Sequence, residues 1–156
     1  MRLHVCAVGR LRTGPERALV DDYSKRFGRM GRGVSLGPLS EHQIDERKAT
    51  SPESEAAALE RAIPSGARLI ALDERGALLG SPEFAALLAR WRDDGAQDTA
   101  FVIGGADGLA PDLRARADVT LSLGRMVWPH MLARVMLVEQ IYRAAGILAG
   151  SPYHRA

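Results

Sequence analysis

Short apolar segments alternate with segments of helical spacing along almost the whole chain, and this alternation restricts the possible folds more than any other feature. The segments with the length and apolar content of strands are 3–8, 34–36, 68–72, 99–103 and 119–123. Those with helical spacing are 15–27, 52–63, 82–91, 111–117 and 131–149. Strands and helices in alternation predict an α/β fold with a mostly parallel sheet. The length of 156 residues suits a single domain over 1–156.

Turn and cap residues add three local expectations. Ser81 is predicted to cap the helix that begins at Pro82, because a hydroxyl can accept a hydrogen bond from the free amides of a first helical turn. The strand 68–72 should be closed by the polar residues 73–76. The polar run 40–55 predicts a mobile loop.

The ligand site of such a fold is expected beyond the carboxyl ends of the strands. The loops after Leu72, Ile103 and Leu123 are therefore the candidates. The second of these, Gly-Gly-Ala-Asp-Gly at 104–108, would let main chain approach a ligand closely. Its spacing differs from the GxGxxG of dinucleotide-binding folds, and no P-loop lysine follows it.

The last helical segment is apolar on nearly every face. Such a helix is normally buried on all sides, and we expect one side of 131–149 to meet a second subunit across a twofold axis. Pro129 stands at its start. Glu139 and Arg143 are spaced to form an ion pair on the helix, which is one explanation of these two charges. Arg134 has no acidic residue at such a spacing on this helix.

The formal charge of +2 is carried by residues 101–156, in which every Lys or Arg is an arginine. Arginine suits bidentate contact with phosphate, and this segment therefore points to an anionic partner. The closing residues Tyr153, His154 and Arg155 have two interpretations. They are either a frayed terminus or a group that stacks on a base and binds its phosphate.

Several classes of protein and site are disfavoured. A single cysteine, Cys6, and four widely separated histidines predict neither a disulfide nor a metal site. No run of apolar residues reaches the roughly 20 needed to span a membrane, and the first ten residues lack the pattern of a signal peptide. A cytoplasmic protein is therefore expected.

The segments "FVIGGADGL", "LSLGRMVWPHMLARVMLVEQIYRA" and "SPYHRA" together resemble the ribosomal RNA large subunit methyltransferase H family of SPOUT methyltransferases. "VCAVGRL" and "LIALDERG" add support upstream, so that the resemblance spans essentially the whole chain. It implies a SPOUT fold with a C-terminal trefoil knot and two such knots packed as a homodimer. It also implies transfer of a methyl group from S-adenosyl-L-methionine to N3 of a pseudouridine in helix 69 of 23S ribosomal RNA, within the assembled ribosome.

The resemblance implies a cofactor site in the same three loops. Its residues are Leu72, Gly104, Gly105, Gly124, Arg125, Met126, Val127, Trp128 and Pro129. Main-chain groups and apolar side chains would hold the adenine there.

Removal of the N3 proton requires a base, or a group that stabilises the resulting anion, close to the methyl group. We expect His130 and, one turn later, Arg134 at that end of the site. The alternative for His130 is a histidine that only caps or packs the helix start. His154 and Arg155, either of the same chain or of a partner subunit, would bind the target nucleotide and assist proton removal. Tyr153 would stack on that nucleotide. Arg143 would lie near the substrate or order the C-terminal tail, which is the segment 153–155.

Two other functions fit parts of the pattern. A ribosome-associated factor that keeps the fold without transferring methyl groups would bind cofactor and give no product. A dinucleotide-dependent oxidoreductase is disfavoured by the missing glycine fingerprint.

Overall fold

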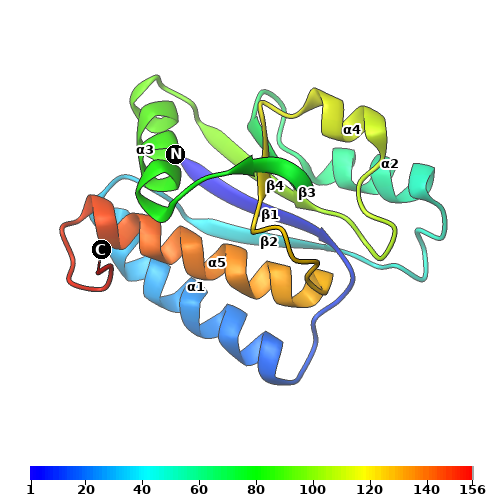
Figure 1. The fold of residues 1–156 in the computed structure, drawn as a ribbon, viewed down its shortest axis with the longest axis horizontal. Coiled ribbons are helices and arrows are strands. Elements are labelled where there is room, and N and C mark those ends of the chain that lie inside the picture. Colours follow the sequence, from blue (N-terminus) through cyan, green and yellow to red (C-terminus); the bar gives the residue numbers. More distant parts are fainter. Residues whose placement is uncertain (156) are drawn as a thin grey trace.

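The computed structural model describes residues 1–155, which form one five-stranded sheet with helices on both faces (Figure 1). The strands are β1 (Arg2–Val8), β2 (Leu39–Ile44), β3 (Arg68–Leu78), β4 (Asp98–Ile103) and β5 (Val119–Ser122). The helices are α1 (Pro15–Gly33), α2 (Pro52–Ala62), α3 (Ser81–Asp93), α4 (Pro111–Arg116) and α5 (His130–Leu148). The strand order is β2-β1-β4-β3-β5, and all four strand pairings are parallel, as the alternation predicts.

The two faces of the sheet carry separate apolar clusters. Leu3 and Val5 of β1 point to the face covered by α1, α3 and α5, whereas Cys6 and Val8 point to the face covered by α2 and α4. This alternation follows from the two-residue period of a strand. Every residue of the central strand β4 is buried, since both of its faces are covered.

The segment between α1 and α2 differs from expectation. Residues 34–36, predicted to be a strand, belong to the connection after α1. The strand β2 lies at 39–44 and so occupies the first residues of the run 40–55 that was expected to be a loop. β2 is an edge strand whose polar side chains bond to neighbouring elements, so it lacks the apolar alternation of a buried strand. The helix α1 also continues to Gly33. Its Gly31 packs so closely that a Cβ would lie 2.6 Å from the Leu36 carbonyl oxygen.

β3 continues past its expected end at Leu72. A bulge between Leu72 and Ala77 interrupts its pairing with β5, and the pairing then resumes. Gly76 allows this, because a Cβ there would lie 2.6 Å from main-chain atoms of Thr120. The cap of α3 was also predicted wrongly. Gly80 is the N-cap, with its N–H bonded to Glu83, while Ser81 Oγ donates to Gln140.

α5 is confirmed as a long helix with every residue buried or half-buried. Much of this burial comes from α1 and α3 of the same chain, which flank α5 on the sheet (Figure 1). The burial of α5 therefore does not by itself require a second subunit. The threading of the C-terminal segment through a loop stays a prediction. Over residues 1–155, no helix combines the length and apolarity that crossing a membrane would demand.

A buried carboxylate ties the amino ends of β1 and β4 together. Asp98, 6% exposed, accepts two hydrogen bonds of 2.7 Å from Arg2 and contacts His4 Nε2 at 2.8 Å. The hydrogen bonds from Arg2, followed by that from His4, lower the pKa of Asp98. Because the pKa of Asp98 is lower in the folded state, its ionised form stabilises the protein at pH values above the unfolded-state pKa of about 4. This stabilisation is lost as the pH falls through the folded-state pKa.

Asp98→Asn is therefore expected to lower the free energy of unfolding by about 1–3 kcal/mol at pH 7, because it removes the charge that Arg2 and His4 face. The loss should shrink as the pH is lowered to about 3. Urea unfolding at the two pH values measures both effects. Asp94→Asn, at an exposed position after α3, is the control and should change stability little. A loss for Asp98→Asn that is equal at both pH values would contradict the assignment.

Candidate active site

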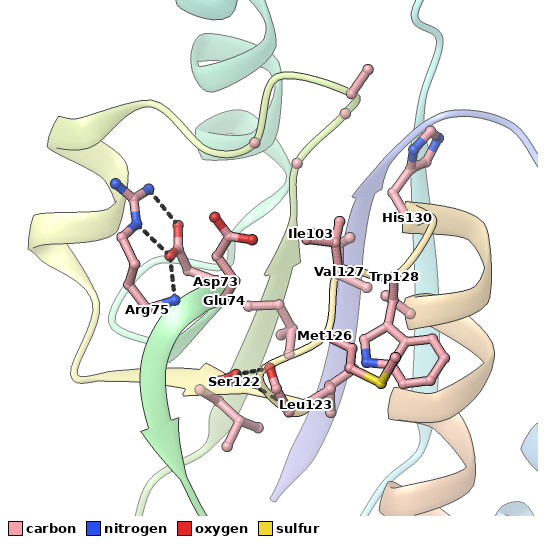
Figure 2. Close-up of a pocket in the computed structure, with 18 of the residues that line it drawn as sticks. Asp73, Glu74, Arg75, Ile103, Ser122, Leu123, Met126, Val127, Trp128 and His130 are labelled. Carbon is pink, nitrogen blue, oxygen red and sulfur yellow. Dashed lines mark hydrogen bonds and ion pairs between the residues drawn. The ribbon is translucent and has the colours of Figure 1, made fainter.

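Three connections meet at the carboxyl edge of the sheet and enclose a cavity of about 490 Å³ (Figure 2). They are the bulge of β3, the loop after β4 and the segment between β5 and α5. They meet because β4, β3 and β5 are neighbours in the sheet and run in the same direction. The volume is typical of a small-molecule site.

Most of the expected cofactor residues line this cavity. They are Leu72, Gly104, Gly105, Gly124, Met126, Val127 and Trp128. Arg125 and Pro129 lie in the same segment without lining it. The first residue of α5, His130, lines the cavity as well.

The loop after β4 is tightly folded, and its backbone forms one wall. A Cβ on Gly104 would lie 2.5 Å from the carbonyl carbon of Gly108 and 2.6 Å from its oxygen, closer than real Cβ atoms come. The Gly108 N–H donates to the Gly105 carbonyl at 3.0 Å. Glycine at 104 is thus required by the turn itself, and the close packing of the turn brings the main chain of Gly104 and Gly105 to the cavity.

Carboxylates form a second wall, which sequence reasoning missed. Asp73 is held by Arg75 at 2.9 Å and Arg114 at 3.3 Å, and the hydrogen bond from Arg75 is the main cause that lowers the pKa of Asp73 to about 2. Glu74 and Asp107 also line the cavity. The signal in the sequence is the acidic pair Asp73 and Glu74 directly after the strand 68–72, although such a pair is equally typical of a closing turn. The wall suits a ligand with cationic or hydroxyl groups.

The third wall is apolar and unusually exposed. Met126 and Val127 are 73% and 80% exposed, and Trp128 is 39% exposed. The start of their segment is fixed by Ser122, whose Oγ donates to the Gly124 carbonyl at 2.8 Å. Figure 2 shows the Trp128 ring beside Met126 at the cavity. Such side chains would lose apolar exposed area if a flat ring bound against them.

His130 lies at the edge of the cavity beside the end of β1. A Cβ on Gly9 would be 3.4 Å from His130 Nε2 and 2.6 Å from the terminal carbon of Met131. The main chain after β1 therefore packs directly on the first turn of α5.

The structure corrects the expected position of Arg134. Its side chain is fully buried, it does not line the cavity, and its guanidinium bonds to the carbonyl oxygens of Val8 and Gly9. The four-residue spacing from His130 correctly places Arg134 one turn further along α5. However, the guanidinium points under β1 and so cannot contact a substrate in this arrangement.

The C-terminal residues are ordered against the end of α5, which contradicts a frayed terminus for Tyr153 and His154. The ion pair of Glu139 and Arg143 is confirmed at 2.6 Å. Tyr153 donates its hydroxyl to Glu139 at 2.9 Å, and its ring lies 4.7 Å from the Arg143 guanidinium. His154 Nδ1 is 3.4 Å from Arg143. Burial, followed by the hydrogen bond to Glu139, raises the pKa of Tyr153.

Within one chain the tail and the cavity do not meet. The cavity lies at the first turn of α5 and the tail at its last, and a helix of 19 residues is about 28 Å long (Figure 1). His130 and the residues Tyr153, His154 and Arg155 are therefore brought together only if the tail of another chain reaches the cavity.

A second groove, of about 520 Å³, lies alongside α5. Apolar side chains from α1, from the end of β3 and from α5 contribute to it, among them Leu19, Tyr23, Leu78 and Met136. Leu19 and Leu78 are 43% and 54% exposed. Among the described residues, no three His, Cys, Asp or Glu side chains are grouped so that they could hold a metal ion.

Comparison with known proteins identifies the family. A family model described as "Predicted SPOUT methyltransferase" matches residues 1–154. Proteins named "Ribosomal RNA large subunit methyltransferase H" from Cereibacter sphaeroides (strain ATCC 17025), Roseobacter denitrificans and Ruegeria pomeroyi are 63%, 61% and 60% identical to this chain. Each alignment covers 155 residues and 99% of both chains. The all-parallel sheet, the cavity at its carboxyl edge and these matches agree, and the chain belongs to the SPOUT methyltransferase family.

Proposed function

We propose that this protein methylates large-subunit ribosomal RNA, using S-adenosyl-L-methionine, at N3 of a pseudouridine in helix 69 of the assembled ribosome. The names of relatives up to 63% identical over 99% of the chain support the class of substrate. The observation that carries the proposal is the cavity formed by the β3 bulge, the glycine loop and the segment before α5. Action on ribosomes would place the protein in the cytoplasm.

The size and the lining residues of the cavity support binding of this cofactor. The backbone of Gly104 and Gly105 would hold it from one side, and Met126 and Trp128 would cover the adenine from the other. The carboxylate wall would face the ribose hydroxyls and the cationic groups. When bound, this group supplies a methyl carbon on a positively charged sulfur.

The chain's own residues must then orient the nucleophile and remove one proton from it. Methyl transfer is an in-line displacement, and alignment of the two reactants can contribute roughly 7–11 kcal/mol. His130, at the cavity edge, is the residue that would accept the imide proton of N3 or stabilise the anion left behind. Arg155 and His154 would bind the nucleotide phosphate and base, with Tyr153 stacking on the base.

The distance between the two parts of this site supports a homodimer as part of the proposal. The exposed apolar side chains Leu19 and Leu78 border the groove beside α5, and a second copy would cover them. In the proposed dimer, the partner's tail reaches the cavity. Arg143 would then order the tail through Glu139 and Tyr153, instead of contacting RNA directly.

The test uses purified protein, S-adenosyl-L-methionine with a radiolabelled methyl group, and ribosomes from a strain without the corresponding enzyme. We expect about one methyl group per ribosome, on a pseudouridine of helix 69, and a rate at least about a hundredfold lower for His130→Ala. Digestion to nucleosides and mapping of the label identify the product. His42→Ala, whose side chain does not line the cavity, is the matched histidine control.

The outcomes separate the competing functions. Cofactor binding without labelled product on any ribosomal substrate would favour the non-enzymatic ribosome factor. Tight binding of a nicotinamide dinucleotide in place of S-adenosyl-L-methionine would favour the oxidoreductase. An undiminished rate for His130→Ala would remove that histidine from the proposed site.

A further inference from the structure

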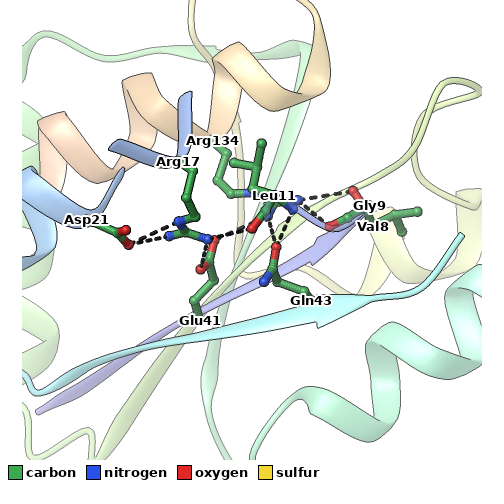
Figure 3. Close-up of polar contacts among 8 residues, drawn as sticks. All are labelled: Val8, Gly9, Leu11, Arg17, Asp21, Glu41, Gln43 and Arg134. Atoms are coloured by element: carbon green, nitrogen blue, oxygen red, sulfur yellow. Dashed lines mark hydrogen bonds and ion pairs between the residues drawn. The ribbon is translucent and has the colours of Figure 1, made fainter. Parts of the chain in front are cut away.

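Arg134 is the largest fully buried side chain among residues 1–155, and its hydrogen bonds reach from α5 to β1 and β2 (Figure 3). Nη2 donates to the carbonyl oxygens of Val8 at 3.2 Å and Gly9 at 2.8 Å. Nη1 donates to Gln43 Oε1 at 2.8 Å and to Glu41 Oε2 at 3.2 Å. One guanidinium thus joins α5 to the end of β1 and to the edge strand β2.

Arg134, Gln43, Glu41 and Arg17 form one polar cluster, and this cluster also holds the residues that follow β1. The Leu11 N–H donates to Gln43 Oε1 at 2.6 Å, so this oxygen accepts from both the loop and Arg134. Arg17 donates to the Leu11 carbonyl at 3.1 Å and to Glu41 at 2.8 Å. Side chains from α1, α5 and β2 therefore fix main-chain groups throughout residues 8–11.

An apolar side chain could fill the same space without the desolvation that burial of a guanidinium requires. Burial lowers the pKa of Arg134, opposed chiefly by Glu41, and its Nε has no hydrogen-bond partner within residues 1–155. Apolar residues of similar volume often stabilise a protein as well as, or better than, a buried ion pair does. The directional hydrogen bonds to main chain are what an apolar side chain could not supply.

The fixed segment borders the cavity at His130. The Gly9 backbone approaches so closely that a Cβ there would lie 3.4 Å from His130 Nε2. A shift of residues 8–11 would therefore free or displace the imidazole. Arg134 itself does not line the cavity, and neither do the main-chain atoms it binds.

We infer that Arg134 is a positioning residue for methyl transfer. Its buried guanidinium fixes residues 8–11 against the first turn of α5 and thereby sets the orientation of His130. This inference rests on the proposed function and deepens it, since it concerns how His130 meets the nucleotide. The inference predicts that kcat depends on the polar cluster around Arg134, whereas the affinity for S-adenosyl-L-methionine does not.

The first variant for testing is Gln43→Ala. Gln43 is exposed on an edge strand, so its removal should leave the fold intact, yet it deletes the acceptor shared by Arg134 and the Leu11 N–H. We expect kcat on ribosomes to fall about tenfold, because small misplacements near reacting groups carry large rate effects. The Kd for S-adenosyl-L-methionine should stay within about twofold, and the Leu11 amide should exchange with solvent faster. Gln97→Ala, an exposed glutamine before β4, should change none of these.

Arg134→Met and Arg134→Lys extend the series. Methionine fills much of the volume without any hydrogen bond, so its kcat should be the lowest, about a hundredfold below wild type, with cofactor affinity retained. Lysine keeps the charge but cannot bridge the same acceptors, and it should give an intermediate kcat. If Arg134→Met does not fold, Gln43→Ala still decides the question.

Two results would overturn the inference. The first is a parallel loss of cofactor affinity and kcat in Gln43→Ala, which would mean a general structural role. The second is an unchanged kcat despite faster exchange at Leu11. Both require a wild-type protein that methylates ribosomes, so absence of product from wild type counts against the proposed function instead.

Discussion

Replacement of Gly104 by valine is expected to abolish measurable binding of S-adenosyl-L-methionine, with Kd raised at least about a hundredfold. The reason is steric, because a Cβ would collide with the main-chain atoms of the Gly108–Leu109 peptide unit. A Cβ at this position would lie 2.5 Å from the Gly108 carbonyl carbon and 2.8 Å from the Leu109 nitrogen. Neither atom belongs to a side chain that could rotate away, so the whole loop 104–108 must move, and that loop is one wall of the cavity.

Trp128 provides the measurement, because its half-exposed ring lies at the cavity while the other tryptophan, Trp91, is buried in the core. Quenching or enhancement of its fluorescence on titration with S-adenosyl-L-methionine gives Kd directly. Gly28→Ala on α1 is the matched control, since nothing lies within 4 Å of a Cβ there, and it should bind as wild type does. Circular dichroism establishes that each variant is folded. Wild-type affinity in folded Gly104→Val would show that the cofactor binds elsewhere.

The position of the cavity could be predicted because it depends on local signals. The apolar segments 68–72, 99–103 and 119–123 mark parallel strands, and parallel strands end at the same edge of a sheet. Glycines directly after the second of these indicate a tight turn there. None of these inferences requires knowledge of which distant residues meet.

The errors arose where distant contacts decide the structure. Glu41 and Gln43 make β2 look like a loop, although their polar side chains bond to Arg17, Arg134 and Leu11. The bulge in β3 depends on the approach of Gly76 to β5, which the segment itself does not reveal. Spacing on α5 correctly separated His130 from Arg134 by one turn. It could not show that the second side chain would be buried beneath β1.

The tail is the clearest case of this limit. Its residue types predicted contact with a nucleotide, but the sequence could not say that Tyr153 bonds to Glu139 at the far end of α5 from the cavity. If the proposed chemistry is right, that separation has a direct consequence. Each active site needs His130 from one chain and His154 with Arg155 from its partner.

Mixed dimers therefore test the arrangement. One chain carries His130→Ala, the other carries His154→Ala with Arg155→Ala, and Tyr153 is kept so that its packing on Arg143 and Glu139 is preserved. Each variant alone should be inactive as a homodimer, because both of its sites lack one component. Heterodimers purified through two different tags should recover about half of the wild-type kcat, since one of their two sites is then complete.

A site built within one chain could not give this recovery. If each site used residues of its own chain alone, the site of the first chain would lack His130 and the site of the second would lack His154 and Arg155. The heterodimer would then be as inactive as either parent. Activity near half of wild type thus requires the tail to cross between subunits. Absence of recovery, in heterodimers that still bind S-adenosyl-L-methionine, would mean that the tail bends back over its own α5. A monomeric protein in solution would contradict the dimer outright, and with it any delivery of His154 and Arg155 to the cavity by a partner.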